Sequence, residues 1–182
     1  GFKMSKSRGN VVVPEVVSEK YGLDAARFFL VSQASPDKDI NWSDKGAEGS
    51  TRIINRIFNY FETVKIGKTS PRIQRKLHST IKNVTEELEE MKYNLSTIRI
   101  RELIESLEQE ISKEDAESVI KLLSPICPHS AEELWEKIGN KGFVSTEKWP
   151  KYNEKLIDTK LDYLDELSDN LRRNINDVLK LI

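Results

Sequence analysis

Apolar residues recur every three or four positions along most of this 182-residue chain. That spacing places them on one face of an α-helix, so each segment that shows it is predicted to be an amphipathic helix. The five clearest stripes consist of Ile53, Ile54, Ile57, Phe58 and Phe61; of Ile73, Leu77, Ile81, Val84, Leu88 and Met91; of Ile100, Leu103, Ile104, Leu107 and Ile111; of Val119, Ile120, Leu123 and Ile126; and of Leu164, Leu167, Leu171, Ile175, Val178 and Ile182.

Residues that favour helix ends mark where the segments begin and stop. Ser70 before Pro71 is a strong N-terminal signal, and Ser112 with Asp115 has the spacing of a capping box. Glycine after a periodic segment favours a stop. The predicted starts are Pro14, Asp24, Ser43, Ser70, Asn94, Ser112 and Thr159, and the predicted stops include Gly22 and, for the short helix that follows "SPICP", Gly139.

Each predicted helix carries a single apolar stripe, which must be buried against another helix. Strand patterns are scarce, apart from the short "NVVVP" at 10–14. We therefore predict an all-α fold, a helical bundle. The last helix either docks on this bundle or leads toward a further domain, because its stripe runs up to Ile182.

The overall charge is balanced, with 29 Lys and Arg against 30 Asp and Glu. Any basic footprint for a nucleic acid must therefore be local. Cys127 is the one cysteine, so an internal disulfide is impossible and a reducing compartment is indicated. No run is long enough to be predicted as a membrane span. We expect a cytoplasmic protein that does not contact membranes.

The chain opens with a cationic stretch that contains no acidic residue, "GFKMSKSRGN". Glycines flank it, and nothing apolar fixes it in place, so we expect a mobile loop that meets an anion. It lacks the spacing of a P-loop. The central residues are Lys3, Met4, Ser5, Lys6 and Ser7.

The five-residue pattern K-M-S-K-S resembles the second signature of the class I aminoacyl-tRNA synthetases. The following "RGN" and the segment "YGLDAARFFL", which is similar to the family's Y-G-x-D-x-x-R, extend the resemblance. It implies that residues 3–7 bind the phosphates of ATP, a substrate used with Mg²⁺. Lys6 would be the main catalytic phosphate contact and Lys3 the supporting one, while Ser5 and Ser7 would shape the loop.

One later segment, "ASPDKDINWSDKGAEGSTRIINRIFNYF", resembles the leucyl-tRNA synthetases in particular. "LLSPICPHSAEELWEKIG", with "KWP" downstream, resembles a segment found across the leucine, isoleucine and valine enzymes, and "YNLSTIRIRELI" resembles the family's F-N-x-A-I segment. The sequence as a whole is more similar to the archaeal and eukaryotic members than to the bacterial ones. The resemblance implies leucine and its tRNA as partners, no DNA, and a monomer. Valyl and isoleucyl enzymes are the alternatives, although W-S-D argues against them, and a non-catalytic helical adaptor is a further one.

The resemblance also implies a division of the chain. Residues 1–40 would be the end of a catalytic domain and its stem-contact junction, and 41–150 the helical domain called anticodon-binding. Residues 151–182 would be a linker and helix that lead toward a missing C-terminal domain. The chain is thus expected to be a fragment without the nucleotide-binding sheet, and to be inactive alone.

A local basic footprint begins in the third predicted helix and continues through a span free of acidic residues between Glu62 and Glu86. Such a stretch can contact RNA phosphates. The alternatives are an ordinary solvated face and pairing with acidic residues of neighbouring helices. The candidates for tRNA contact are Arg52, Arg56, Lys68, Arg72, Arg75 and Lys76.

Metal chemistry is not indicated. Cys127 and His129, even with His78, supply too few ligands for a structural zinc site. The sequence also lacks a Ser-His-Asp order and a G-x-G-x-x-G motif. We expect no metal site in this chain.

Overall fold

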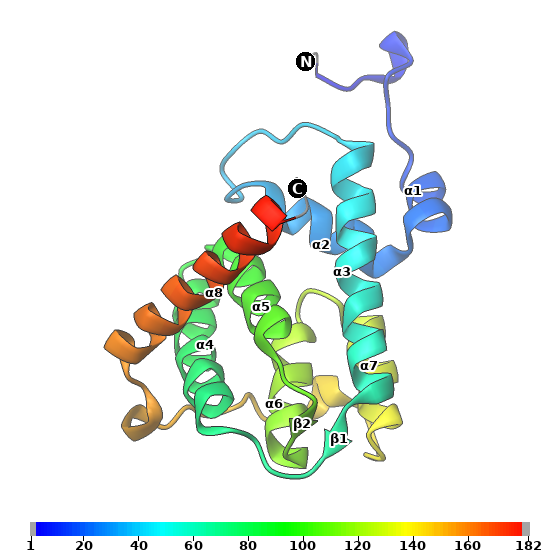
Figure 1. Cartoon of the computed structure of the whole chain (residues 1–182). Coiled ribbons are helices and arrows are strands. Elements are labelled where there is room, and N and C mark those ends of the chain that lie inside the picture. The colour runs from blue at the N-terminus through cyan, green and yellow to red at the C-terminus, as the bar shows by residue number, and fades with distance from the viewer. Residues whose placement is uncertain (1–2, 180–182) are drawn as a thin grey trace.

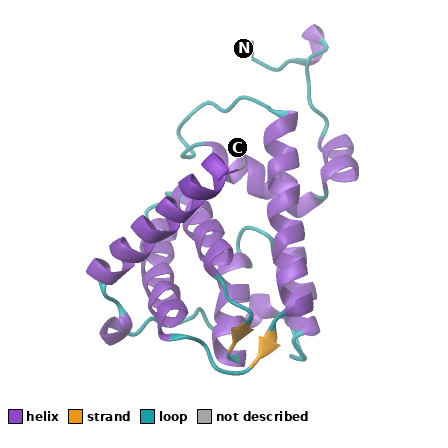
Figure 2. Ribbon diagram, in the orientation of Figure 1, coloured by secondary structure: helices purple, strands orange, loops and turns teal. Residues whose placement is uncertain are grey.

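The computed structural model describes residues 3–179 and confirms the all-α prediction. The helices are joined by short loops and by three single 3₁₀ turns, Lys6–Arg8, Val144–Thr146 and Glu154–Leu156. Figure 2 shows how fully helix dominates the fold. The α-helices are α1 (Pro14–Tyr21), α2 (Leu23–Gln33), α3 (Asp44–Thr63), α4 (Pro71–Glu89), α5 (Tyr93–Ser106), α6 (Lys113–Leu123), α7 (Pro128–Lys137) and α8 (Thr159–Leu179).

Three of the predicted serine caps are confirmed. Ser43, Ser70 and Ser112 each accept the backbone N–H three residues further on, at 3.2, 3.3 and 3.1 Å. These bonds satisfy amide groups that a helix start leaves without an intrahelical partner. Gly139, with φ 86°, also ends α7 as predicted.

Two predicted caps are wrong. Asp24 lies inside the first turn of α2, after Leu23, and its carboxylate is buried and used elsewhere. Asn94 is likewise inside α5, which begins at Tyr93 without a side-chain cap. In the sequence, a polar residue at the second position of a helix looks the same as one at the N-cap. Asp24 and Asn94 both occupy that second position.

Two short strands were not predicted. β1 (Lys65–Ile66) pairs in parallel with β2 (Glu110–Ile111), and the segment 107–111 therefore leaves the helix predicted for it. Two-residue strands show no alternation that a sequence could reveal. The run "NVVVP" is not a strand. The strand pair fastens the end of α3 to the segment that enters α6.

The core lies where α2 to α7 meet. Figure 1 shows α4 and α5 as an antiparallel hairpin, with α6 and α7 packed behind, and α2 packs against both α3 and α5. The opening loop projects away from this bundle, whereas α1 packs against α2 and α3 through its buried side chains Val17 and Tyr21. Ile57, Leu77, Ile81, Ile100 and Leu103 of the predicted stripes are fully buried. Phe29, Leu122 and Leu134, which lie outside the five stripes, are fully buried as well.

The apolar stripe of α8 is not buried against the bundle. Leu164, Leu171 and Val178 are 55, 60 and 58 % exposed. The first turns of α8 are held by ion pairs from Arg75 of α4 to Asp162 and Asp165, and Arg72 of α4 lies 4.0 Å from Asp165. We predicted that the last helix either docks on the bundle or leads toward a further domain. Over the described residues, α8 does not dock through its apolar stripe. Ile182 lies outside them.

Candidate functional site

The opening loop folds into a small turn held by Asn10. The Asn10 side chain accepts the N–H of Ser5 at 2.9 Å and donates to the carbonyl of Lys3 at 3.4 Å. The hydroxyls of Ser5 and Ser7 lie 3.3 Å apart, and Gly9 ends the turn with φ 63°. A left-handed residue at this position favours glycine. The loop therefore has a local fold of its own, outside the bundle.

The lysines of this loop are exposed and have no acidic partner. Neither Lys3 nor Lys6 forms an ion pair within residues 3–179. An unpaired ammonium in water keeps its charge available for a phosphate. The arrangement fits the predicted contact with a polyphosphate, and Met4, Ser5 and Ser7 lie in the same turn.

Behind the loop, α2 is fixed to the start of α7 by Asp24. Its carboxylate accepts the backbone N–H of Ser130 at 2.6 Å and lies 3.0 Å from His129 Nδ1. The residue before α7, Cys127, offers no side-chain cap. Asp24 therefore supplies, from another helix, the acceptor that the N-terminus of α7 needs.

Arg27, one turn after Asp24, binds the backbone just before α7. Its Nε donates to the carbonyl of Ile126 at 3.0 Å and its Nη2 to that of Pro125 at 3.3 Å. Asp24 and Arg27, the D-x-x-R pair of "YGLDAARFFL", thus both bind the "SPICPHS" segment. Arg27 binds its backbone before α7, and Asp24 binds the start of α7. Sequence reasoning found both segments and missed that they bind each other.

The six basic residues predicted to contact tRNA fall on two separate surfaces. Arg72 lies near Glu108 and Asp165, and Arg75 is 15 % exposed between Asp162 and Asp165, so both face α8. The pairing alternative therefore holds for these two arginines. The remaining residues of this surface, Lys68 before α4 and Lys76 on it, have no ion pair among the described residues.

The other two, Arg52 and Arg56, line an open hollow of about 560 Å³ between α2, α3 and α5. Arg101 of α5, which sequence reasoning did not single out, lines the same hollow. Arg56 pairs with Glu105 at 3.2 Å. The only signal for Arg101 was its position in a predicted helix, which does not reveal the helix that faces it.

Within residues 3–179, no three His, Cys, Asp or Glu side chains come together in a way that could hold a metal ion. In the same part of the chain, no helix has the length and apolarity needed to cross a membrane.

Comparison with known proteins matches these features to one family. Residues 72–181 match the anticodon-binding domain of tRNA ligases, and residues 1–43 match the class I tRNA synthetases for isoleucine, leucine, methionine and valine. The chain belongs to the class I aminoacyl-tRNA synthetases, and its bundle is of the anticodon-binding type. The boundaries predicted at residues 40 and 150 stay predictions.

Within that class, the chain is homologous to leucine–tRNA ligases. The ligase of Rickettsia bellii is 37% identical over 86% of this chain and 20% of the relative. That of Geobacter sp. is 34% identical over 96% of the chain and 24% of the relative. The chain thus spans about a fifth to a quarter of their length. Both are bacterial, so the expected archaeal or eukaryotic character is not confirmed.

A solved structure shares the fold. The ternary complex of Agrobacterium radiobacter K84 agnB2 LeuRS with tRNA and LeuAMS superposes with a TM-score of 0.73. It is 27% identical, and the match covers 87% of this chain and 23% of that one. The similarity extends over most of the helical bundle.

Proposed function

We propose that this chain is the part of a leucine–tRNA ligase that carries the phosphate loop and the tRNA-binding helical domain. The whole enzyme would join leucine to its tRNA through leucyl-adenylate, with ATP as substrate and Mg²⁺. The observation that supports this most directly is the exposed turn of residues 3–7, whose two lysines have no acidic partner among the described residues. A cytoplasmic location and a monomeric state complete the proposal.

In the activation step, a leucine carboxylate oxygen attacks the α-phosphorus of ATP and pyrophosphate leaves. Negative charge then grows on the bridging and β-phosphate oxygens. A compact ammonium that approaches these oxygens stabilises the transition state more than the ground state. We assign Lys6 the main contact and Lys3 the supporting one. Met4, Ser5 and Ser7 would contribute the backbone and hydroxyl groups around them.

The helical bundle would hold the tRNA. The similar agnB2 enzyme is described in complex with tRNA, which supports this assignment. Arg52, Arg56, Lys68 and Lys76 remain proposed contacts. Arg72 and Arg75 also remain proposed, but their ion pairs with acidic side chains would have to be exchanged for phosphates.

The test is Lys6→Ala in the full-length enzyme. We expect leucine-dependent ATP–pyrophosphate exchange to fall by roughly a hundredfold, the effect typical of losing one transition-state charge contact. Lys151→Ala, which removes an exposed lysine from the irregular segment after the bundle, is the control. Unchanged exchange in Lys6→Ala would refute the assignment. The 182-residue chain alone should show no exchange, because residues 3–179 form no nucleotide-binding sheet.

A further inference from the structure

We propose that the hollow between α2, α3 and α5 binds a backbone phosphate of the RNA through Arg52, Arg56 and Arg101. We further infer that Glu105 holds Arg56 in the free protein and opposes this binding. The inference rests on the proposed function, because that function makes RNA the partner. The inference adds three elements to the proposed function: a defined phosphate site, a third arginine (Arg101) and an inhibitory acidic residue (Glu105).

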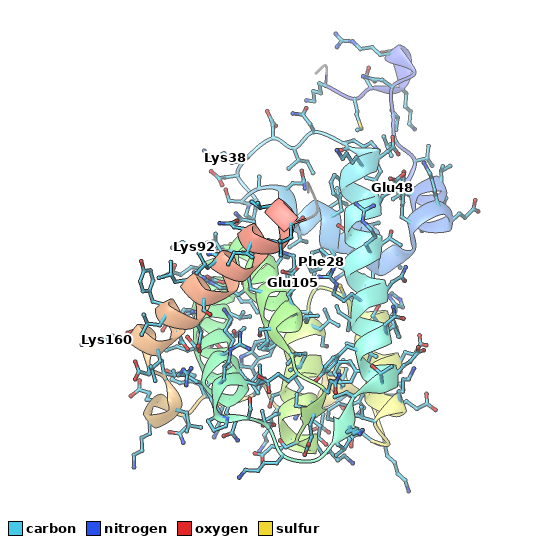
Figure 3. All side chains as sticks on the ribbon, in the orientation of Figure 1. Phe28, Lys38, Glu48, Lys92, Glu105 and Lys160 are labelled. Atoms are coloured by element: carbon cyan, nitrogen blue, oxygen red, sulfur yellow. The ribbon has the colours of Figure 1, made fainter. Side chains whose placement is uncertain are left out.

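Three helices bring the arginines together. Arg52 and Arg56 lie one turn apart on α3, and Arg101 reaches the same hollow from α5. Figure 3 shows Phe28 and Glu105 in the space between α3 and α5, where the hollow lies. Guanidinium groups that approach from two sides suit a phosphate, because each can donate two parallel hydrogen bonds to its oxygens.

The charge in the hollow is not balanced by protein groups. Arg56 has Glu105 at 3.2 Å, while Arg52 and Arg101 have no ion pair within residues 3–179. Glu105 is the one acidic side chain among the residues that line the hollow. Three positive charges against one negative charge leave a local excess, which an anion would neutralise with release of its counterions.

The other groups in the hollow do not favour readout of a base. The hydroxyl of Ser50 donates to Gly46 O at 3.3 Å, and that of Thr97 to Asn94 O at 2.7 Å, so neither proton is free. Phe28 is 3 % exposed and offers no stacking surface. Apart from the side-chain amide of Gln33, the donors that remain are the three arginines. Their charge suits the sugar–phosphate backbone, which carries no sequence information.

The surface of α4 is a weaker candidate. Arg75 already has two carboxylates, Asp162 and Asp165, and its side chain is only 15 % exposed. A phosphate there would have to displace acidic groups of the same chain. Arg52 and Arg101 would bind a phosphate without losing a described ion pair.

The experiment measures the binding of a leucine tRNA transcript to the 182-residue chain at a series of salt concentrations. We expect Arg52→Gln and Arg101→Gln each to weaken binding roughly tenfold at low salt, and to reduce the slope of log affinity against log salt by about one. Arg101→Lys keeps the charge and loses the paired donors, so it should fall between Arg101→Gln and the unchanged protein.

Two further variants make the test specific. Arg99→Gln removes the same charge from α5, but Arg99 pairs with Glu87 and Glu102 and is absent from the hollow. It should change affinity less than twofold, whereas the effects in the hollow should be several times larger. Glu105→Gln should tighten binding several-fold, because it removes the acidic competitor for Arg56.

The outcomes separate the two proposals. If the unchanged chain binds tRNA and Arg101→Gln behaves like Arg99→Gln, the hollow is not the site, and the proposed function stands. Weaker binding in Glu105→Gln would also overturn the inference. If the unchanged chain binds no tRNA even at low salt, RNA binding by this domain fails together with its site. Circular dichroism confirms that each variant is folded.

Discussion

The carboxylate of Asp24 in α2 accepts a 2.6 Å hydrogen bond from the backbone N–H of Ser130 at the start of α7, 106 residues further along the chain. One side chain thereby caps a helix to which it does not belong. Because α2 leads back to the opening loop and α7 belongs to the bundle, this bond fixes one relative to the other. The bond therefore connects the helix that follows the candidate catalytic loop with the bundle that we propose binds tRNA.

Removal of the Asp24 carboxylate should destabilise the whole fold. Asp24 is 6 % exposed, and Asp24→Ala leaves the Ser130 amide without its acceptor. We expect the free energy of unfolding to fall by about 1–3 kcal/mol. Urea unfolding followed by circular dichroism measures it. Asp39→Ala, which removes an exposed carboxylate from the loop after α2, should change stability by less than about 0.5 kcal/mol. Equal losses in the two variants would contradict the cap.

Cys127 lies at the same contact between α2 and α7, so the reactivity of its thiol shows whether this contact is closed. It is fully buried, and burial raises the pKa of its thiol well above the usual range. The thiolate is the reactive form, so a thiol reagent should label the native chain far more slowly than the urea-unfolded chain. Because this is the one cysteine, the signal is unambiguous. Asp24→Ala should speed native labelling, whereas rapid labelling of the unchanged chain would show that the junction is open.

The helices and most of their caps could be predicted because their signals are local. Ser70 and Ser112 act within three residues of themselves. The role of Asp24 could not be predicted, because its partner is distant in sequence and an aspartate near a helix start normally caps that helix. The K-M-S-K-S loop was predicted from its motif together with the matching "RGN" and "YGLDAARFFL" segments. Arg101 was missed because only the packing of α3 and α5 on α2 brings it to the hollow that Arg52 and Arg56 line.

Met91 is a place where a substitution should stabilise the protein. It has φ 58°, and it ends α4 with two bonds typical of a Schellman motif, from its own N–H to Leu88 O and from Lys92 N–H to Glu87 O. Glycine adopts this conformation without steric cost. Since the side chain is 63 % exposed, Met91→Gly should raise the free energy of unfolding by about 1 kcal/mol.

The control for this prediction is the preceding residue. Glu90 has φ −86°, which gives glycine no advantage. Glu90→Gly should therefore leave stability unchanged or lower it, because glycine adds backbone freedom to the unfolded chain. If both glycine variants change the urea midpoint in the same direction, the left-handed conformation at Met91 does not determine stability there.

Tyr21 and Asp44 should make stability depend on pH at both ends of the range. The Tyr21 hydroxyl donates to the Asp44 carboxylate, which lowers the pKa of Asp44 and raises the pKa of Tyr21. A lowered carboxyl pKa gives stability that is present at neutral pH and lost as pH falls through that pKa. A raised phenol pKa gives stability that is lost as pH rises through it.

We therefore expect the unchanged protein and Tyr21→Phe to differ most between about pH 5 and 9, and to converge at acidic pH below about 4 and at alkaline pH above about 10. Urea unfolding at a series of pH values measures this difference. Tyr93→Phe, which removes the hydroxyl of a tyrosine at the start of α5, is the control and should show no such profile. A difference that is constant with pH would show that Tyr21 stabilises the fold by packing alone.

Arg75 should hold α8 on the bundle. In Arg75→Asp the ion pairs to Asp162 and Asp165 are replaced by repulsion between like charges, and we expect chymotrypsin to cut at the exposed Tyr163 several-fold faster. Adding Asp165→Arg should restore an ion pair and most of the resistance. Resistance that is unchanged in the single variant would show that α8 is held by other contacts. The same pair of proteins tests the tRNA contact predicted for Arg75, because binding that stays weak after α8 is restored would indicate a direct contact with RNA.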